Sequence, residues 1–232
     1  MKKIILFQLL TVLTQTAFCQ ADSLIFINVS ESRIANDVNA AIYNGQEHTG
    51  YSSLIEGIPY YESKEWQTGT LVFQNLFYKD VFLKYDLVAD QLVVRHPNGI
   101  TGIVLFTRRI QSFTLGNKHF VNLDTDKESE LKSGIYEELV NGRMSLYAKR
   151  SKLFEENIVL NELERKFIDK NVLYVLKDGH YYAVKKQKTI MKLIADKRNA
   201  VTSAMKASKI KFKSNPELAL IKMVEVYNQL SY

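Results

Sequence analysis

The chain has 232 residues, a formal charge of +6 at pH 7, 46% hydrophobic side chains and a single cysteine. This length is enough for one domain that buries its own core, and the lone cysteine excludes a disulfide within the chain. No apolar run beyond the first twenty residues is long enough to predict a transmembrane helix in the mature chain.

The first twenty residues have the pattern of a secretory signal peptide. Lys2 and Lys3 form a positively charged start, and an apolar stretch follows over residues 4–13. This stretch is too short to span a membrane but has the length of the apolar part of a signal peptide. Residues 1–20 are therefore predicted to be removed after export.

Two kinds of cleavage compete around the only cysteine. Standard cleavage needs small residues at positions −3 and −1, and a cut after Cys19 places Ala17 and Cys19 there, while a cut after Ala21 also satisfies the rule. Lipidation of Cys19 instead requires a small residue before the cysteine, where Phe18 stands. We therefore expect a cysteine-free mature chain that begins near Gln20 and is periplasmic or outer-membrane-associated, with a lipoprotein as the less favoured alternative.

Residues 24–65 give a weaker signal than the rest of the chain. Over 34–43, the spacing of Ile34, Val38, Ala41 and Ile42 fits a short helix, and an asparagine and a glycine follow. An irregular lead-in to the sheet explains the same segment, so both interpretations stay open.

From residue 66 onward, strand patterns alternate with turns. Over 79–88, the side chains of Val81, Leu83, Tyr85 and Leu87 share one face, as in a strand with one buried side. Hairpin turns are predicted where asparagine, aspartate or glycine tolerates positive φ, at 97–99, 116–117, 141–142 and 177–179.

These hairpins predict the fold class. Repeated tight turns indicate antiparallel neighbours, and a meander of about nine strands must curve or form two layers to cover its apolar face. We expect an α+β protein that is mainly β, with a curved antiparallel β-meander, as a sandwich or partial barrel, over 21–186. Residues 151–170 are charged and loosely helical, which indicates an insertion between hairpins.

From Lys188 the pattern changes to a helical period. One apolar stripe runs to residue 205, a break follows at 209–212, and a second helix is expected to start at 214–217. Ser214 and Glu217 have the spacing of a capping box, and Pro216 suits the first turn. The prediction is a pair of amphipathic helices in a basic segment, 187–232, packed on the β body or, alternatively, on a partner.

The charges are unevenly distributed. Residues 181–232 contain eleven Lys/Arg and three Asp/Glu, so they carry +8, whereas residues 20–180 carry −4. Such asymmetry favours an anionic partner, which after export would be an envelope protein or an anionic envelope surface rather than nucleic acid. Lysines that merely solvate the helices, or a tail attracted to its own body, are alternatives. The predicted contacts are Lys206, Lys209, Lys211 and Lys213.

We find no catalytic or metal-binding pattern. The acidic run 124–130 does not fit a calcium loop, because Ser129 and Ile135 stand where glycine and glutamate are needed. The histidines are too far apart in the sequence for a metal-ligand pattern, and no glycine-rich phosphate loop occurs. The prediction is therefore no catalytic residue, no metal and no cofactor. The histidines are His48, His96, His119 and His180.

Several stretches resemble a known group of sequences. The run EWQTGTLVFQNLFYKDVFLKYDLVADQLVVRHPNG, together with GIPYYESKEWQTG, KDGHYYAVK and FKSNPELALIKMVEVYNQL, is similar to a family of uncharacterised exported proteins of Bacteroidota. These stretches are scattered over residues 57–230. The resemblance implies a periplasmic or outer-membrane-associated site, and it implies no activity and no catalytic residue.

Three hypotheses about function follow. The first is a non-enzymatic exported accessory or binding protein that docks on an outer-membrane or periplasmic assembly, since export, a basic tail and absent catalytic motifs all favour it. The second is a carrier or sensor of an apolar ligand such as a lipid, held in the curved sheet. The third is an envelope hydrolase, which needs a cleft with converging polar groups.

Overall fold

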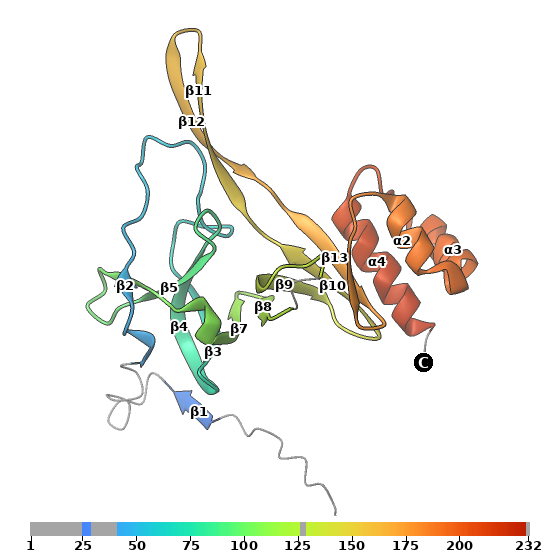
Figure 1. Cartoon of the computed structure of the whole chain (residues 1–232), viewed down its shortest axis with the longest axis horizontal. Helices are drawn as coiled ribbons and strands as arrows, with labels where there is room; N and C mark the ends of the chain where they lie inside the picture. The colour runs from blue at the N-terminus through green and yellow to red at the C-terminus, as the bar shows by residue number, and fades with distance from the viewer. Residues whose placement is uncertain (1–24, 29–40, 126–128, 231–232) are drawn as a thin grey trace, which may run out of the picture.

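A computed structural model describes residues 25–28, 41–125 and 129–230 of the chain (Figure 1). Within these residues, strands form one twelve-stranded sheet and one two-stranded sheet, and helices follow at the C-terminus. The predicted mainly β fold with an antiparallel sheet is confirmed. The prediction of about nine strands was too low, and the large sheet is not closed into a barrel.

The large sheet consists of two antiparallel meanders that meet where β3 pairs with β7. The first contains β3 (Gln67–Phe73), β4 (Leu76–Asp86), β5 (Gln91–Arg95) and β6 (Gly102–Val104), with β2 (Gln46–Glu47) beside β6 and β1 (Ile25–Asn28) parallel to β4. The second contains β7 (Ile110–Leu115), β8 (Lys118–Leu123), β9 (Gly134–Val140), β10 (Met144–Lys149), β13 (Val172–Lys177) and β14 (His180–Ala183). A 3₁₀ turn, η1 (Thr107–Arg109), connects the meanders.

The tight turns lie where the sequence predicts them. Residues 116–117 join β7 to β8, and residues 178–179 join β13 to β14. Asp178 and Gly179 have φ values of 51° and 78°, which aspartate and glycine tolerate at low cost. Local turn chemistry thus determines the antiparallel order of this part of the sheet.

Aromatic rings fill one side of the curved sheet. Phe113 and Phe120 stack with their ring centroids 4.7 Å apart, and Tyr85 meets the two rings edge-on at 5.6 and 5.4 Å. Tyr61, from the loop before β3, lies edge-on to Phe120 at 5.0 Å. Each such pair contributes about 0.5–1.5 kcal/mol beyond its buried area, so this cluster anchors the first core.

A second core lies between the sheet and the C-terminal helices. The helical segment contains α2 (Gln187–Leu193), the 3₁₀ turn η2 (Ala195–Lys197), α3 (Arg198–Ser208) and α4 (Pro216–Gln229). Their apolar stripes bury Met144 and Leu146 of β10 and Val175 of β13. The helices therefore complete the core of the sheet, as the position of α4 beside β10 in Figure 1 shows.

The predicted pair of helices is wrong in number, because η2 divides the first helix. The turn directs Asp196 toward α4, where its carboxylate accepts a hydrogen bond from the Tyr227 hydroxyl at 3.2 Å. Ile194 and Val201, on either side of the turn, both remain fully buried. Tertiary contacts therefore outweigh the continuous helical period of the sequence at this point.

The start of α4 also differs from the predicted capping box. Asn215, not Ser214, is the N-cap, and its side chain accepts a hydrogen bond from the Leu218 amide at 3.0 Å. Pro216 occupies the first turn as expected. Glu217 does not reach back to the cap, because both of its oxygens accept hydrogen bonds from Arg150.

The segment 151–170, predicted to be loosely helical, is a β-hairpin. β11 (Lys152–Val159) and β12 (Glu162–Asp169) pair over eight residues, with Phe154 opposite Phe167. The apolar and aromatic side chains of the two segments suit strands, and Leu160 and Asn161 turn the chain at φ values of 51° and 67°. Figure 1 shows this hairpin extending β10 and β13 away from the body. Residues 34–40, where a short helix was an open alternative, lie outside the described residues.

Candidate functional site

The four lysines predicted to contact an anionic partner line a single groove. This basic groove lies between α2, α3 and the segment that follows α3, and its volume is about 700 Å³. Lys206, Lys209, Lys211 and Lys213 are exposed around it. The remaining lining residues are Gln187, Thr202, Met205, Ile210 and Phe212.

The local backbone explains why the lysines gather there. Helix α3 ends at Ser208. The next residue, Lys209, caps the helix in the left-handed conformation at φ 57°, and its amide donates a hydrogen bond to the Lys206 carbonyl. The next residues alternate, so that Ile210 and Phe212 are half-buried while the lysines between and after them face solvent. Cations at a helix C-terminus also interact favourably with the helix dipole, which favours Lys206 in the last turn.

The charges of the groove are not neutralised. Among the described residues, no acidic side chain lies within ion-pair distance of Lys206, Lys209, Lys211 or Lys213. Residues 205–213 contain these four lysines and no acidic residue. The groove thus combines an apolar floor with a rim of free positive charge, which suits a ligand that is both anionic and partly apolar.

The helical segment contacts the β body through its acidic side chains and not through its lysines. A basic tail attracted to an acidic body would place tail lysines against body carboxylates. Instead, two tail carboxylates pair with body cations: Glu217 with Arg150 at 2.7 Å and Asp196 with Lys177 at 3.7 Å. The third, Glu225, pairs with Lys222 of its own helix. The four lysines of the groove are therefore left for other partners.

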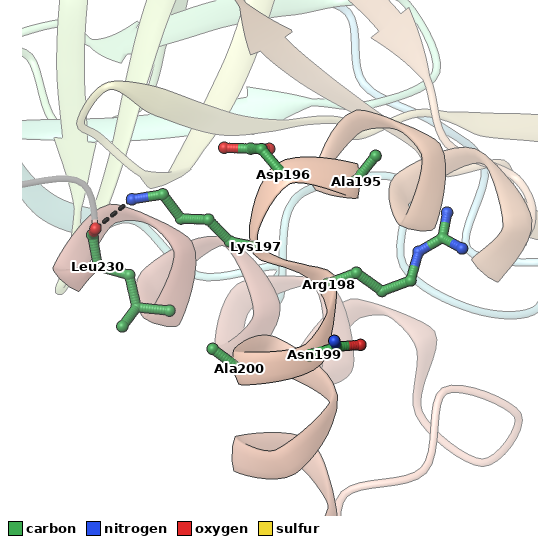
Figure 2. Close-up of a pocket in the computed structure, with 7 residues that line it drawn as sticks. All are labelled: Ala195, Asp196, Lys197, Arg198, Asn199, Ala200 and Leu230. Carbon is green, nitrogen blue, oxygen red and sulfur yellow. Dashed lines mark hydrogen bonds between the residues drawn. The ribbon is translucent and has the colours of Figure 1, made fainter.

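A second hollow in the helical segment, of about 610 Å³, is less suited to binding. It is lined by residues 195–200 and Leu230, and Figure 2 shows Lys197 directed at the Leu230 carbonyl oxygen. Arg198 donates to the Met191 carbonyl at 2.9 Å, and Asp196 is paired with Lys177. Because its charged groups already have partners within the chain, this hollow offers little free charge to a ligand.

A polar cluster around Asp86 is the feature most similar to a catalytic arrangement. The buried Asp86 carboxylate accepts hydrogen bonds from His48 Nε2 at 2.8 Å, from the Tyr51 hydroxyl at 3.0 Å and from the Val88 and Ala89 amides at 2.9 Å each. Burial alone would raise the pKa of Asp86, but the hydrogen bonds from His48, Ala89 and Tyr51 lower it overall.

This cluster has a structural role. The Gly50 amide donates to His48 Nδ1 at 3.2 Å, and a backbone amide can only donate, so the ring proton sits on Nε2 and points at Asp86. Both nitrogens of His48 are then engaged, which leaves none free to act as a general base. The cluster fastens the loop between β2 and β3 to the end of β4.

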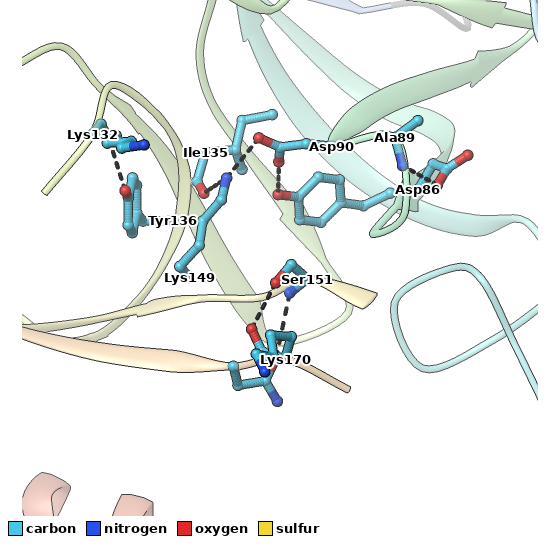
Figure 3. A network of polar contacts seen from close by, with 11 residues as sticks. Asp86, Ala89, Asp90, Lys132, Ile135, Tyr136, Lys149, Ser151 and Lys170 are labelled. Carbon is cyan, nitrogen blue, oxygen red and sulfur yellow. Dashed lines mark hydrogen bonds and ion pairs between the residues drawn. The ribbon is translucent and has the colours of Figure 1, made fainter. Parts of the chain in front are cut away.

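A third polar group joins the two halves of the sheet. Asp90 accepts a hydrogen bond from the Tyr85 hydroxyl at 2.5 Å and from Lys149 Nζ at 2.7 Å. Lys149 also donates to the Ile135 carbonyl at 2.9 Å and lies 5.1 Å from the Tyr136 ring centroid (Figure 3). The polar atoms of these groups are hydrogen-bonded to one another, and the bonds connect β4, β9 and β10.

The described part of the chain contains no group of three or more His, Cys, Asp or Glu side chains that could hold a metal ion. Among the described residues, no helix has the length and apolarity needed to span a membrane. Comparison of the chain with known protein families, curated proteins and solved structures finds no match.

Of the residues singled out in the sequence, the structure brings together the four lysines of the basic groove. Ala17, Cys19 and Gln20, at the predicted cleavage site, lie outside the described residues. The apolar floor formed by Met205, Ile210 and Phe212 was not predicted. Its signal in the sequence is the alternation over 209–213, which indicates an extended segment with one apolar and one basic side.

Proposed function

We propose that the protein is a non-enzymatic, exported binding protein of the cell envelope, and that its basic groove docks on an acidic, partly apolar segment of a protein in an outer-membrane or periplasmic assembly. One observation carries the proposal: four lysines without acidic partners in the described chain surround a floor of half-buried apolar side chains. Their charges face outward rather than toward the sheet.

The two parts of the groove would contribute differently to binding. Burial of apolar side chains against Met205, Ile210 and Phe212 supplies affinity, at about 25 cal/mol per Å² of apolar surface. The lysine rim supplies attraction at a distance, which raises the association rate and selects acidic partners. Binding should therefore weaken with added salt without disappearing.

A hollow with an apolar floor favours a protein segment over a flat anionic surface. A lipid or polysaccharide surface would require only exposed charge, which the chain presents in several other places. The groove volume of about 700 Å³ can receive several side chains. We therefore favour a protein segment over an envelope surface as the partner.

Charge reversal on the groove tests the proposal. Deletion of 187–232 is unsuitable, because these residues cover Met144, Leu146 and Val175 of the sheet. The chain with Lys209→Glu and Lys211→Glu is instead compared with wild type in affinity purification from the native envelope with mass spectrometry. We expect an acidic protein partner to be recovered with wild type and to fall at least tenfold with the groove variant.

Lys185→Glu with Lys186→Glu is the matched control. It changes the net charge by the same amount at exposed positions of the tail that do not line the groove. Equal recovery of the same partners with wild type, groove variant and control would refute the proposal. Equal losses with both variants would show that overall charge, not the groove, determines binding.

A further inference from the structure

The tip of the β11–β12 hairpin is an unusual surface. We define the tip as residues 155–164, which contain four glutamates and no lysine or arginine. Its apolar side chains are exposed to 77% at Ile158, 95% at Leu160 and 52% at Leu163. Clustered exposed apolar side chains of this kind mark interaction sites rather than ordinary surface.

At its end, the tip gathers its most exposed apolar side chains beside unpaired glutamates, with Val159, 42% exposed, opposite Glu162. Ile158 and Leu163 are cross-strand partners, so their side chains lie together on one face of the ribbon. Glu162 and Glu164 alternate with Leu163 and therefore lie on the opposite face, and neither forms an ion pair with a described residue. Leu160 occupies the turn between the two faces.

The turn itself carries a cost that binding would explain. Leu160 has a φ of 51°, a conformation that asparagine and glycine adopt much more readily than leucine. An exposed leucine in this conformation contributes nothing to the core of its own chain. Local strain of this kind is common at binding sites.

The tip complements the basic groove in both charge and polarity. Of the four glutamates of the tip, Glu156 pairs with Arg165 at 2.6 Å, and the other three form no ion pair with a described residue. These three match the four lysines of residues 205–213, which contain no acidic residue. The apolar floor formed by Met205, Ile210 and Phe212 can receive Ile158, Leu160 and Leu163, while the unpaired glutamates reach the lysine rim.

The two surfaces cannot meet within one chain. The hairpin continues β10 and β13 outward, whereas the helices pack at the other end of these strands, on Met144 and Leu146 (Figure 1). A strand of eight residues, such as β11, extends the ribbon by about 26 Å. The geometry therefore places the tip and the groove of one chain far apart and leaves both open to a second chain.

We infer that the groove receives the hairpin tip of a second copy of this chain, so that copies join head to tail. This inference rests on the proposed function, because it names the partner of the same groove. The interface is heterologous: one copy contributes its tip and the next its groove, so the assembly grows as an open chain or closes as a ring.

Complementary charge reversal tests the inference on the purified chain. One variant carries Glu162→Lys and Glu164→Lys at the tip, and the other carries Lys209→Glu and Lys211→Glu in the groove. Sedimentation velocity from about 5 to 500 μM at low and at moderate salt should show that wild type self-associates and that added salt weakens the association. Each variant alone should be monomeric, with a dissociation constant raised at least tenfold.

An equimolar mixture of the two variants distinguishes direct contact from a general effect of charge. In the mixture, the unchanged tip of the groove variant meets the unchanged groove of the tip variant. In the second contact, the lysines of Glu162→Lys and Glu164→Lys meet the glutamates of Lys209→Glu and Lys211→Glu. Association should therefore return to within about threefold of wild type. Leu160→Asn should also weaken wild-type association, since it removes an apolar contact and not a charge.

Three outcomes would overturn the inference. These are a wild-type chain that is monomeric at every concentration, self-association that survives both charge reversals, and a mixture that stays monomeric. A monomeric wild type whose groove variant nevertheless loses an envelope partner would refute self-assembly and support the proposed function. A monomeric wild type whose lysines bind phosphatidylglycerol vesicles, and whose recovery of protein partners is unchanged by the groove variant, would refute both.

Discussion

Arg150 joins three elements through a single side chain. It follows β10, donates from Nε to Glu137 of β9 at 2.6 Å, and donates from its two terminal nitrogens to Glu217 of α4 at 2.7 and 2.8 Å. Glu137 is almost fully buried and Arg150 is 11% exposed, so the pair lies in a medium where charges interact strongly. The guanidinium therefore attaches the first turn of α4 to the sheet.

This contact predicts a specific pH dependence of stability. The hydrogen bonds from Arg150 lower the pKa of Glu217, against a smaller opposing effect of burial. A carboxyl whose folded pKa is lowered adds stability above its unfolded pKa, near 4.5, and loses it as the pH falls through the folded value. Glu217→Gln should thus lower the free energy of unfolding by about 1 kcal/mol at pH 7, a value reduced by the partial exposure of Glu217.

Urea unfolding between pH 7 and pH 3 measures the effect. The difference between wild type and Glu217→Gln should shrink as the pH falls from 4.5 through the lowered pKa of folded Glu217, because the protonated carboxyl is then uncharged like glutamine. Arg150→Met is the contrasting variant, since it leaves the buried Glu137 with only Lys118, 3.7 Å away, as its cation and should cost about 3–5 kcal/mol. A difference that stays constant with pH would show that the contact depends on shape and not on the ionised carboxylate.

At the scale of elements, the β11–β12 hairpin shows a conflict between local conformation and exposed side chain. Leucine in the left-handed region costs roughly 1–2 kcal/mol, and asparagine costs less because its side chain can bond locally. Leu160 is 95% exposed, so its removal forfeits no core contact. Leu160→Asn should therefore stabilise the hairpin against local opening.

Amide hydrogen exchange in the hairpin is the appropriate measurement, because a projecting ribbon opens without global unfolding. We expect exchange of the β11–β12 amides to slow by about two- to fivefold, which corresponds to less than 1 kcal/mol. Leu163→Asn is the control at an ordinary strand position, where the same chemical change removes a cross-strand contact and should speed exchange. Faster exchange in Leu160→Asn would mean that Leu160 supports the turn instead of straining it.

The same elements show what sequence patterns can and cannot predict. Period-two alternation and turn residues predict the strands and the hairpin at Asp178 and Gly179, because both signals are local. The hairpin at 151–170 was mistaken for a helical insertion, since charged residues are interspersed with its apolar ones and the turn at Leu160 has no glycine. The break between α2 and α3 depends on contacts of Asp196 with Lys177 and Tyr227, which no local pattern encodes.

The candidate site was predicted in part for the same reason. Positive charge is visible in composition, so the lysines of the groove were found. The groove lysines remain unpaired because the helical segment contacts the body through its carboxylates instead. Glu217 and Asp196 pair with Arg150 and Lys177 across the interface, and this arrangement appears only once the helices are docked.

At the scale of the whole molecule, two excisions of different segments should have opposite effects. Residues 187–232 contribute one side of the second core, and their removal exposes Met144, Leu146 and Val175. At about 1.5–3 kcal/mol for each side chain, this exposure alone costs roughly 5–9 kcal/mol. Such a loss equals the whole stability of a typical domain, so the remaining β body should not unfold as a cooperative unit.

Replacement of residues 152–169 by Asn-Gly should leave the fold intact. The Lys170 amide donates to the Ser151 carbonyl at 2.8 Å, so these two residues already form a pair that a two-residue turn can close. The excision removes the contact of Phe167 with Tyr51, at 5.2 Å between ring centroids, and the backbone hydrogen bonds that Glu56 forms with Arg165 and Phe167. It also removes the hydrogen bond from the Lys152 amide to the Leu87 carbonyl at 2.9 Å. We expect a cooperative thermal transition lowered by roughly 2–8 °C, for a loss of about 1–2 kcal/mol.

Thermal unfolding followed by far- and near-UV circular dichroism distinguishes the two variants. If the chain without 187–232 melts cooperatively with preserved near-UV signal, the helices are an appendix and not part of the core. If the chain without the hairpin loses its transition, the ribbon supports the body and is not free to serve as an arm. With the expected results, the helices belong to the fold, and the hairpin is the one large element whose removal should abolish self-association while the rest of the molecule stays folded.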